Sequence, residues 1–131
     1  MRYLPPFSVL KHGVRLVSLR GQLKVDMTYE ELLDLVKTLL RAIPFDEPWY
    51  CSTYPDVADA VARGAYRSAQ QHFVEHGYFE GRLPFPLEVD EAWYLKTYPD
   101  VGTSVSEGAV ISALDHFVRH GYEEGRRPGE V

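Results

Sequence analysis

The residues best suited to chemistry in this sequence are four histidines that occur as two pairs. His72 and His76 form one pair, and His116 and His120 form the other. Each pair has i, i+4 spacing, which places both imidazoles on one face of a helix, as two ligands of one metal ion would lie. One hypothesis is therefore a small metal protein, in which the two pairs together complete a four-histidine site.

A structural role accounts for the same histidines with fewer requirements. The second histidine of each pair precedes a glycine, so it is expected in a last helical turn, where imidazole interacts with free carbonyl groups. The first is expected to pack under tyrosines, with one ring nitrogen bonded to a backbone carbonyl. The chain lacks the His-Glu-x-x-His motif of metalloproteases. We favour structural histidines without metal or cofactor, and a pH-sensitive interface is a further alternative.

Two acid–base pairs also recur, Asp56 with Arg82 and Asp100 with Arg126. They suggest either an anion-binding or acid–base site, or an ion pair that links a turn to the start of a helix. We favour the ion pair, because an active site is rarely needed twice within 44 residues. The aromatic residues offer another alternative, since Trp49 and Trp93 are large enough to remain partly exposed and to contact carbohydrate.

These residues belong to a tandem repeat. Residues 45–87 and 89–131 align without a gap at a spacing of 44, and 24 of the 43 aligned positions are identical. Self-similarity at such a period is typical of stacked helical units. We expect each copy to contain three short helices, and we expect the two copies to pack together as one domain.

The shared positions predict where those helices begin and end. In the first copy, Asp46 is a helix N-cap and Pro55 starts a second helix, which Gly64 ends. Ser68 caps a third helix that is expected to end at Gly77. The Glu-Gly-Arg sequence that follows is expected to form a turn.

The N-terminal 44 residues are not repeated. Thr28 and Glu31 form a capping box, and the apolar spacing that follows predicts a helix over 29–42. Residues 14–26 alternate as β-structure does, either as a hairpin turned at 20–21 or as one bent strand. Such a ribbon is marginal by itself, so it is the most favoured partner-binding element. The apolar residues assigned to that contact are Val14, Leu16, Leu19, Leu23 and Val25.

Composition excludes several classes of protein. The chain of 131 residues is 45% hydrophobic and carries a net charge of −5, which indicates a globular protein that does not bind nucleic acid. Its single cysteine, Cys51, excludes an internal disulfide framework and is interpreted as a small apolar residue. No apolar run predicts a transmembrane helix or a cleaved signal peptide. A cytoplasmic location is the default, and secretion without a cleaved signal stays open.

The repeat resembles a known bacterial type. The motifs that carry the resemblance are Phe45-Asp46-x-x-Trp49-Tyr50, Tyr54-Pro55-Asp56-Val57, His72-Phe73, Gly77 and Glu80-Gly81-Arg82-x-Pro84. Similar repeats are appended to glycosyltransferases and other proteins of surface-polysaccharide loci, and they occur in secreted repeat proteins. The resemblance covers about residues 45–128. It implies a helical accessory module, without assigned catalytic residues, whose partner is a glycosyltransferase or another component of envelope biosynthesis.

The sequence thus predicts a mainly α-helical protein, with two tandem repeats of short helices preceded by one longer helix and a small β element. Its expected organisation is an N-terminal contact region at 1–44 and repeats at 45–88 and 89–131. The expected function is a non-catalytic adaptor or regulatory protein that binds another protein, and homo-oligomerisation is also possible. A carbohydrate-binding module and a small histidine–metal protein are the alternatives.

Overall fold

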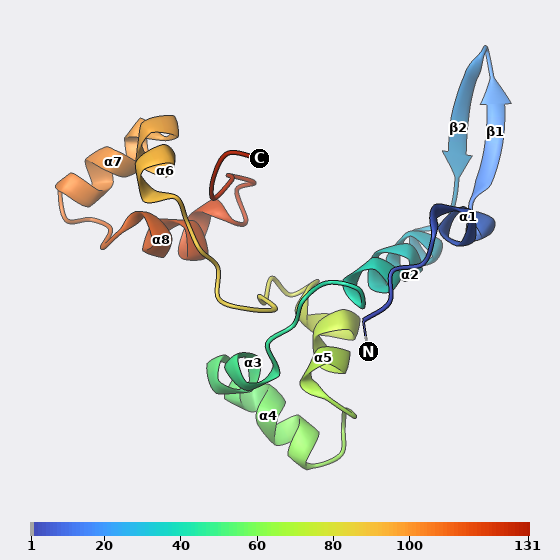
Figure 1. The fold of residues 1–131 in the computed structure, drawn as a ribbon, viewed down its shortest axis with the longest axis horizontal. Helices are drawn as coiled ribbons and strands as arrows, with labels where there is room; N and C mark the ends of the chain where they lie inside the picture. The colour runs from blue at the N-terminus through green and yellow to red at the C-terminus, as the bar shows by residue number, and fades with distance from the viewer. Residues whose placement is uncertain (1) are drawn as a thin grey trace. The chain divides into compact units, whose positions relative to one another are not determined.

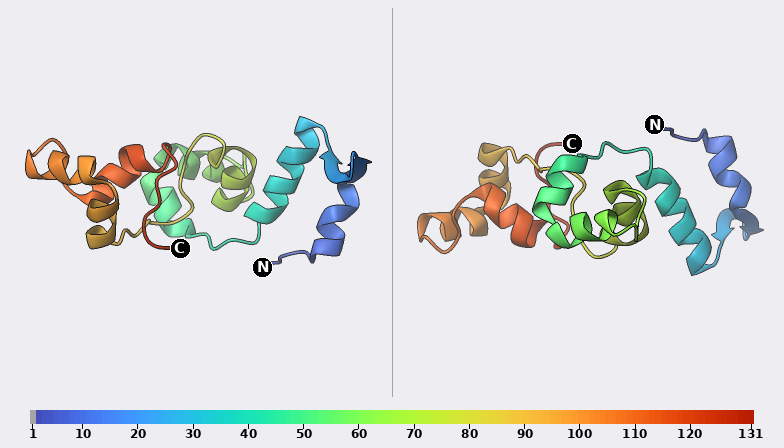
Figure 2. Two further views of the ribbon diagram at one scale, coloured as in Figure 1. Left: turned by 90° about the horizontal axis from the view of Figure 1, so that it is seen from above. Right: turned by 90° about the horizontal axis from the view of Figure 1, so that it is seen from below.

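The computed structural model describes residues 2–131 and confirms the predicted fold class. Its first segment contains helix α1 (Phe7–Leu10), a 3-10 turn η1 (Lys11–Gly13), strands β1 (Arg15–Leu19) and β2 (Gln22–Asp26), and helix α2 (Tyr29–Leu40). Figure 1 shows the strands as a two-stranded ribbon that extends beyond α1 and α2. In both views of Figure 2, α2 lies between α1 and the helices of the first repeat.

The two repeats consist of the same elements in the same order. The first contains α3 (Glu47–Thr53), α4 (Pro55–Ala62), α5 (Ala69–His72) and the π-helical turn η2 (Phe73–Gly77). The second contains α6 (Glu91–Thr97), α7 (Pro99–Ser106), α8 (Ala113–His116) and the π-helical turn η3 (Phe117–Gly121). The chain divides into two compact units, one up to Phe85 and the other from Pro86 to Val131. Packing of the two repeats on each other stays a prediction.

The hairpin alternative is the one that the structure adopts. β1 and β2 are antiparallel, and Leu19 pairs with Gln22 across a two-residue turn. Both turn residues have positive φ, 50° at Arg20 and 76° at Gly21. A type I′ turn requires this geometry, and its twist matches that of the strands.

Local capping explains why the helices begin where they do. The side chains of Asp46 and Ser68 accept hydrogen bonds from backbone N–H groups three residues further on, and Asp90 and Ser112 repeat the arrangement. Thr28 caps α2 in the same way. α2 ends at Leu40, two residues before the predicted boundary. The chain turns there, and Ile43 packs against the core of the first repeat.

Each repeat has its own aromatic core. In the first, the fully buried Tyr50 and Phe73 pack at 83° with their ring centroids 5.9 Å apart, and Val57 completes the centre. Tyr94 and Phe117 reproduce this contact at 81° and 5.9 Å. Burying one such side chain contributes about 1.5–3 kcal/mol. The first core also contains Leu40 of α2, so the longer helix belongs to it.

Each repeat closes on itself. In the first, the backbone N–H of Asp46 donates to the carbonyl of Pro84 over 3.0 Å, which joins the end of the repeat to its beginning. In the second, Asp90 and Pro128 form the same bond at 2.9 Å. The same backbone hydrogen bond therefore closes each unit.

Candidate functional site

The first histidine of each pair lies in a buried contact with a tyrosine from the first helix of its repeat. The Tyr50 hydroxyl and His72 Nδ1 are 3.0 Å apart, and the Tyr94 hydroxyl and His116 Nδ1 are 2.8 Å apart. Both histidines are buried. The predicted partner, a backbone carbonyl, was therefore wrong for this nitrogen. The sequence signal for the tyrosine contact was that both repeats separate the tyrosine and the histidine by 22 residues.

Protonation is unfavourable in this contact. Burial lowers the pKa of His72, and the nearby positive charge of Arg82 lowers it further. Burial also raises the pKa of the Tyr50 hydroxyl well above its ordinary value. At neutral pH the contact therefore joins a neutral imidazole to a neutral phenol. Such a pair holds two helices together but is not poised to exchange a proton near pH 7.

Gly77 and Gly121 lie beside these tyrosines and have a different role from the one predicted. Neither has the positive φ of a residue that ends a helix in the left-handed conformation; Gly81 and Gly125 have it instead, at 84° and 78°. A Cβ atom at Gly77 would overlap the Tyr50 hydroxyl, and one at Gly121 would overlap that of Tyr94. The predicted end of the third helix at Gly77 is confirmed, since Gly77 and Gly121 are the last residues of η2 and η3, but close approach to the tyrosine is what requires glycine there.

The recurring acid–base pairs form ion pairs within each repeat. Arg82 donates two hydrogen bonds to the Asp56 carboxylate, at 2.9 and 2.8 Å, and its guanidinium carbon lies 5.0 Å from the centre of the Tyr54 ring. Arg126 makes the same contacts with Asp100 and Tyr98. Hydrogen bonding from the arginine holds the pKa of each aspartate below its ordinary value. Each guanidinium thus has a carboxylate on its edge and an aromatic ring on its face.

The two histidines of each pair lie side by side. The ring centroids of His72 and His76 are 6.1 Å apart, and those of His116 and His120 are 5.6 Å apart. The Nδ1 atom of the first histidine in each pair is already engaged by a tyrosine. Residues 2–131 contain no group of three or more His, Cys, Asp or Glu side chains placed to hold a metal ion.

The tryptophans are half-buried and contact other aromatic side chains. Trp49 meets Tyr54 edge to face, with ring centroids 6.3 Å apart, and Trp93 meets Tyr98 in the same way at 6.1 Å. In the second repeat, Arg127 also lies over the indole at 5.6 Å. The indoles therefore brace the turn between the first two helices of each repeat.

The N-terminal segment is where the structure leaves apolar side chains unpacked. From residue 2 to residue 39 no residue is buried, and every residue of β1 and β2 is exposed. Twelve of the eighteen exposed large hydrophobic residues in the described chain lie in this stretch. A segment of regular structure without a core requires another surface for its stability.

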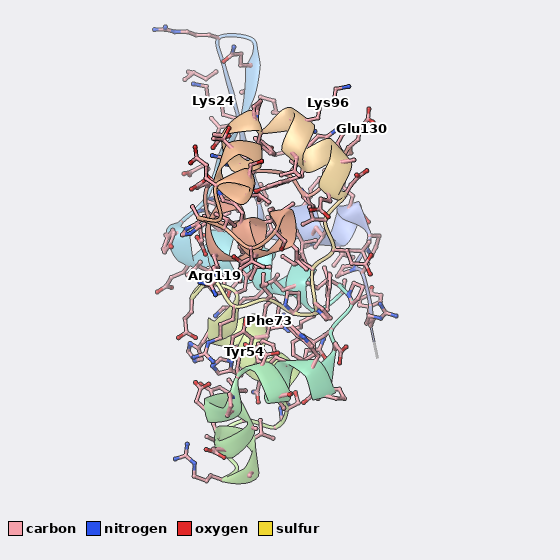
Figure 3. The ribbon with its side chains drawn as sticks, turned by 90° about the vertical axis from the view of Figure 1, so that its left-hand side faces the viewer. Lys24, Tyr54, Phe73, Lys96, Arg119 and Glu130 are labelled. Carbon is pink, nitrogen blue, oxygen red and sulfur yellow. The ribbon has the colours of Figure 1, made fainter. Side chains whose placement is uncertain are left out.

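The hairpin has one apolar face. Directly paired residues share a face, so Leu16, Ser18, Leu23 and Val25 lie on one side. Leu23 and Val25 are 71% and 57% exposed. We call these four residues the apolar hairpin face. The opposite face carries all the charged and amide side chains of the two strands together with Val17 and Leu19; one of the charged residues is Lys24, which Figure 3 labels.

Two of the five residues assigned to partner binding lie elsewhere. Leu19 pairs with Gln22 on the opposite face of the hairpin. Val14 precedes the strand and is half-buried. It lines a groove of about 300 Å³ with Leu10 and Leu35, among other residues. Side chains alternate between the two faces of a strand, so the register of the hairpin places Leu19 on the face opposite to Leu16, Leu23 and Val25.

Comparison with known proteins identifies no relative: no family model, curated protein or solved structure matches the chain. No helix within residues 2–131 is long and apolar enough to cross a membrane.

Proposed function

We propose that this protein is a non-catalytic adaptor that binds another protein through its N-terminal segment. The observation that carries the proposal is the lack of any buried residue between residues 2 and 39, although this stretch contains two strands and most of α2. Covering the apolar hairpin face would give the ribbon the packing that it lacks alone. By resemblance, the partner belongs to bacterial polysaccharide or envelope biosynthesis.

The arrangement of polar groups in the repeats favours a binding role over catalysis. The buried histidine of the first repeat is neutral and engaged by a tyrosine, and each arginine of the ion pairs is held by an aspartate. These groups link elements of one repeat to each other. Within residues 2–131, the polar side-chain contact that joins the hairpin to α2 is the exposed ion pair of Arg15 with Glu31.

Affinity capture with face-selective variants tests the proposal. The bait is the full chain, used against an extract of the source cell and followed by mass spectrometry. We expect the double variant Leu23→Ser, Val25→Ser to lose the specific partner, because it removes two of the three apolar side chains of the hairpin face. Lys24→Ser is the matched control on the opposite face and should retain the partner.

The proposal fails if the double variant, folded as judged by circular dichroism, captures the same partner in the same amount as the wild type. Light scattering on the purified proteins provides the second arm. A wild-type dimer that the double variant converts to a monomer would identify the partner as a second copy of the chain. The readout in both arms is binding, because the proposed function is not catalytic.

A further inference from the structure

The two repeats share a core but differ on one outer face. In the first repeat α2 covers this face. Leu40 of α2 joins the same core cluster as Val74, which is only 3% exposed. At the edge of the contact, Lys37 Nζ lies 3.0 Å from Glu75 Oε2, and an Arg41 nitrogen lies 3.6 Å from Glu75 Oε1. The covering helix is therefore seated by apolar contacts and by two positive charges around one carboxylate.

The same face of the second repeat is uncovered. Val118, the counterpart of Val74, is 44% exposed. Leu114 lies in α8 four residues before Val118, Ile111 precedes the Ser112 cap, and the two are 42% and 83% exposed. In the first repeat their counterparts Gln70 and Arg67 are half-buried and exposed, so the contact with α2 is made at Val74 and Glu75. Together Ile111, Leu114 and Val118 form what we call the apolar stripe.

Apolar character at this stripe is specific to the second copy. The positions of Leu114 and Ile111 hold Gln70 and Arg67 in the first repeat. The copy that lacks a covering helix thus has more apolar residues on this face. Exposure to solvent would instead favour polar side chains such as Gln70 and Arg67. This difference points to a surface that is covered by something outside the repeat.

The positive charge of Arg119, at the edge of the apolar stripe, indicates which kind of helix would bind there. Arg119, which Figure 3 labels, occupies the repeat position that Glu75 has in the first copy. Its guanidinium pairs with Asp115 at 2.8 Å while remaining 67% exposed. A helix bound to the second repeat as α2 is bound to the first would place two side chains near Arg119, at the positions that Lys37 and Arg41 occupy in α2. Basic side chains there would be repelled, and acidic ones would be attracted. The α2 helix of a second copy, which offers Lys37 and Arg41, is therefore disfavoured.

We propose that the apolar stripe binds an amphipathic helix of a partner protein, with acidic residues at the two positions that correspond to Lys37 and Arg41 of α2. The apolar side of the helix would lie against Ile111, Leu114 and Val118, in the way that helix-binding proteins contact the apolar face of their targets. The stripe is small, so the complex is expected to be weak and transient. This site lies in the second unit and requires no residue of the N-terminal segment.

The first experiment uses two synthetic peptides that span residues 27–43. One has the native sequence, and the other carries Lys37→Glu and Arg41→Glu. Each is titrated to millimolar concentration into the full chain labelled with ¹⁵N, and amide shifts are followed by NMR. We expect the acidic peptide to shift the amides of Ile111, Leu114 and Val118, and to bind about fivefold more tightly than the native peptide. Because the chain has a net charge of −5, overall charge would favour the opposite order.

Two variants of the chain test whether the stripe carries this binding. Arg119→Glu should reverse the preference between the peptides, and Val118→Ser should weaken both. Lys96→Ala, an exposed substitution on α6 of the same unit, is the matched control and should change neither.

Three results would overturn the proposal: no shift at millimolar peptide, shifts confined to the first repeat, or equal affinity for the two peptides. Concentration-dependent shifts of the stripe without any peptide would also overturn it, since they would assign the face to a second copy of the chain. None of these results depends on the hairpin, so the proposed function of the N-terminal segment is tested separately.

Discussion

The aromatic centre of each repeat depends on one glycine whose importance comes from space. The Tyr50 hydroxyl reaches His72 Nδ1 across the position where a side chain of Gly77 would lie. A tyrosine that is fully buried must satisfy its hydroxyl group, and here the imidazole provides the partner. The histidine therefore completes the core, and the glycine makes room for the hydrogen bond.

The substitution Gly77→Ala should destabilise the protein by about 1–3 kcal/mol, because its methyl group would displace the tyrosine hydroxyl or the π-helical turn. Urea unfolding monitored by circular dichroism measures the loss. Gly13→Ala is the control, since nothing lies within 4 Å of a Cβ atom at Gly13 and its φ is not positive. Equal stability of the Gly77 variant and the wild type would contradict the close approach.

The buried histidine also predicts a dependence of stability on pH. Because burial lowers the pKa of His72 in the folded state, the unfolded chain binds a proton first as the pH falls. His72 therefore costs stability below its unfolded pKa of about 6.5, and the cost grows until the pH reaches the folded pKa. At pH values well above the unfolded pKa, His72 is neutral in both states and does not make stability depend on pH.

We expect the difference in unfolding free energy between the wild type and His72→Gln to be smaller at pH 5.5 than at pH 7.5. Urea unfolding at the two pH values gives the four numbers required. A difference that is the same at both values, or larger at the lower one, would show that the imidazole is not held neutral. The pKa of Asp56 is held below its ordinary value, so this carboxylate titrates at lower pH than the histidine. It is also present in both proteins, so its contribution cancels in the comparison.

At the scale of elements, the closure of each repeat depends on the tyrosine that precedes Pro-Asp-Val. The Tyr54 hydroxyl accepts a hydrogen bond from the backbone N–H of Leu83 at 3.1 Å, and its ring lies under Arg82. One side chain thus ties the junction of α3 and α4 to the terminal turn. Leu83 is itself buried, so its N–H group has no ready access to water.

Tyr54→Phe should therefore cost about 1–2 kcal/mol, because it leaves that N–H group without its acceptor while keeping the ring. Tyr98→Phe is the matched change in the second repeat. There the donor is the N–H of Arg127, an exposed residue, so a smaller loss is expected. Chemical denaturation of both variants makes the comparison. A larger loss for the Tyr98 variant would contradict the assignment of the cost to burial.

At the scale of the whole molecule, the two units have cores of different size. The core of the first contains six buried residues, including Leu40 of α2 and Val74, whereas that of the second contains four. The second unit has no helix that corresponds to α2. Because stability grows with the apolar area buried, the second unit should be the weaker of the two.

Amide hydrogen exchange is expected to show lower protection in residues 86–131 than in residues 40–85. The matched substitutions Val57→Ala and Val101→Ala remove a fully buried side chain from each core and should each cost roughly 1–3 kcal/mol. Exchange should increase mainly in the unit that carries the substitution. Equal protection throughout the chain would show that the unequal cores do not control local stability.

The sequence by itself determined the features that depend on neighbours in the chain. Repetition at 44 residues, the caps at Asp46 and Ser68, the turn after Ala62 and the amphipathic helix at 29–40 all follow from local conformational preference and spacing. They predicted the mainly helical fold with its N-terminal β element, because capping and turn geometry involve residues only a few positions apart. The predicted helix over 29–42 was two residues too long at its end, since α2 ends at Leu40.

Only the tertiary structure decided what the shared and the differing residues do. It joined Tyr50 to His72 over 22 positions, and it showed that Gly77, the last residue of η2, is required for space and not for a left-handed conformation. It also showed which apolar residues remain uncovered, since Val74 is buried with Leu40 of α2 in the first repeat whereas its counterpart Val118 is exposed in the second. Burial depends on contacts between elements that are distant in the chain, and local pattern carries no record of those contacts.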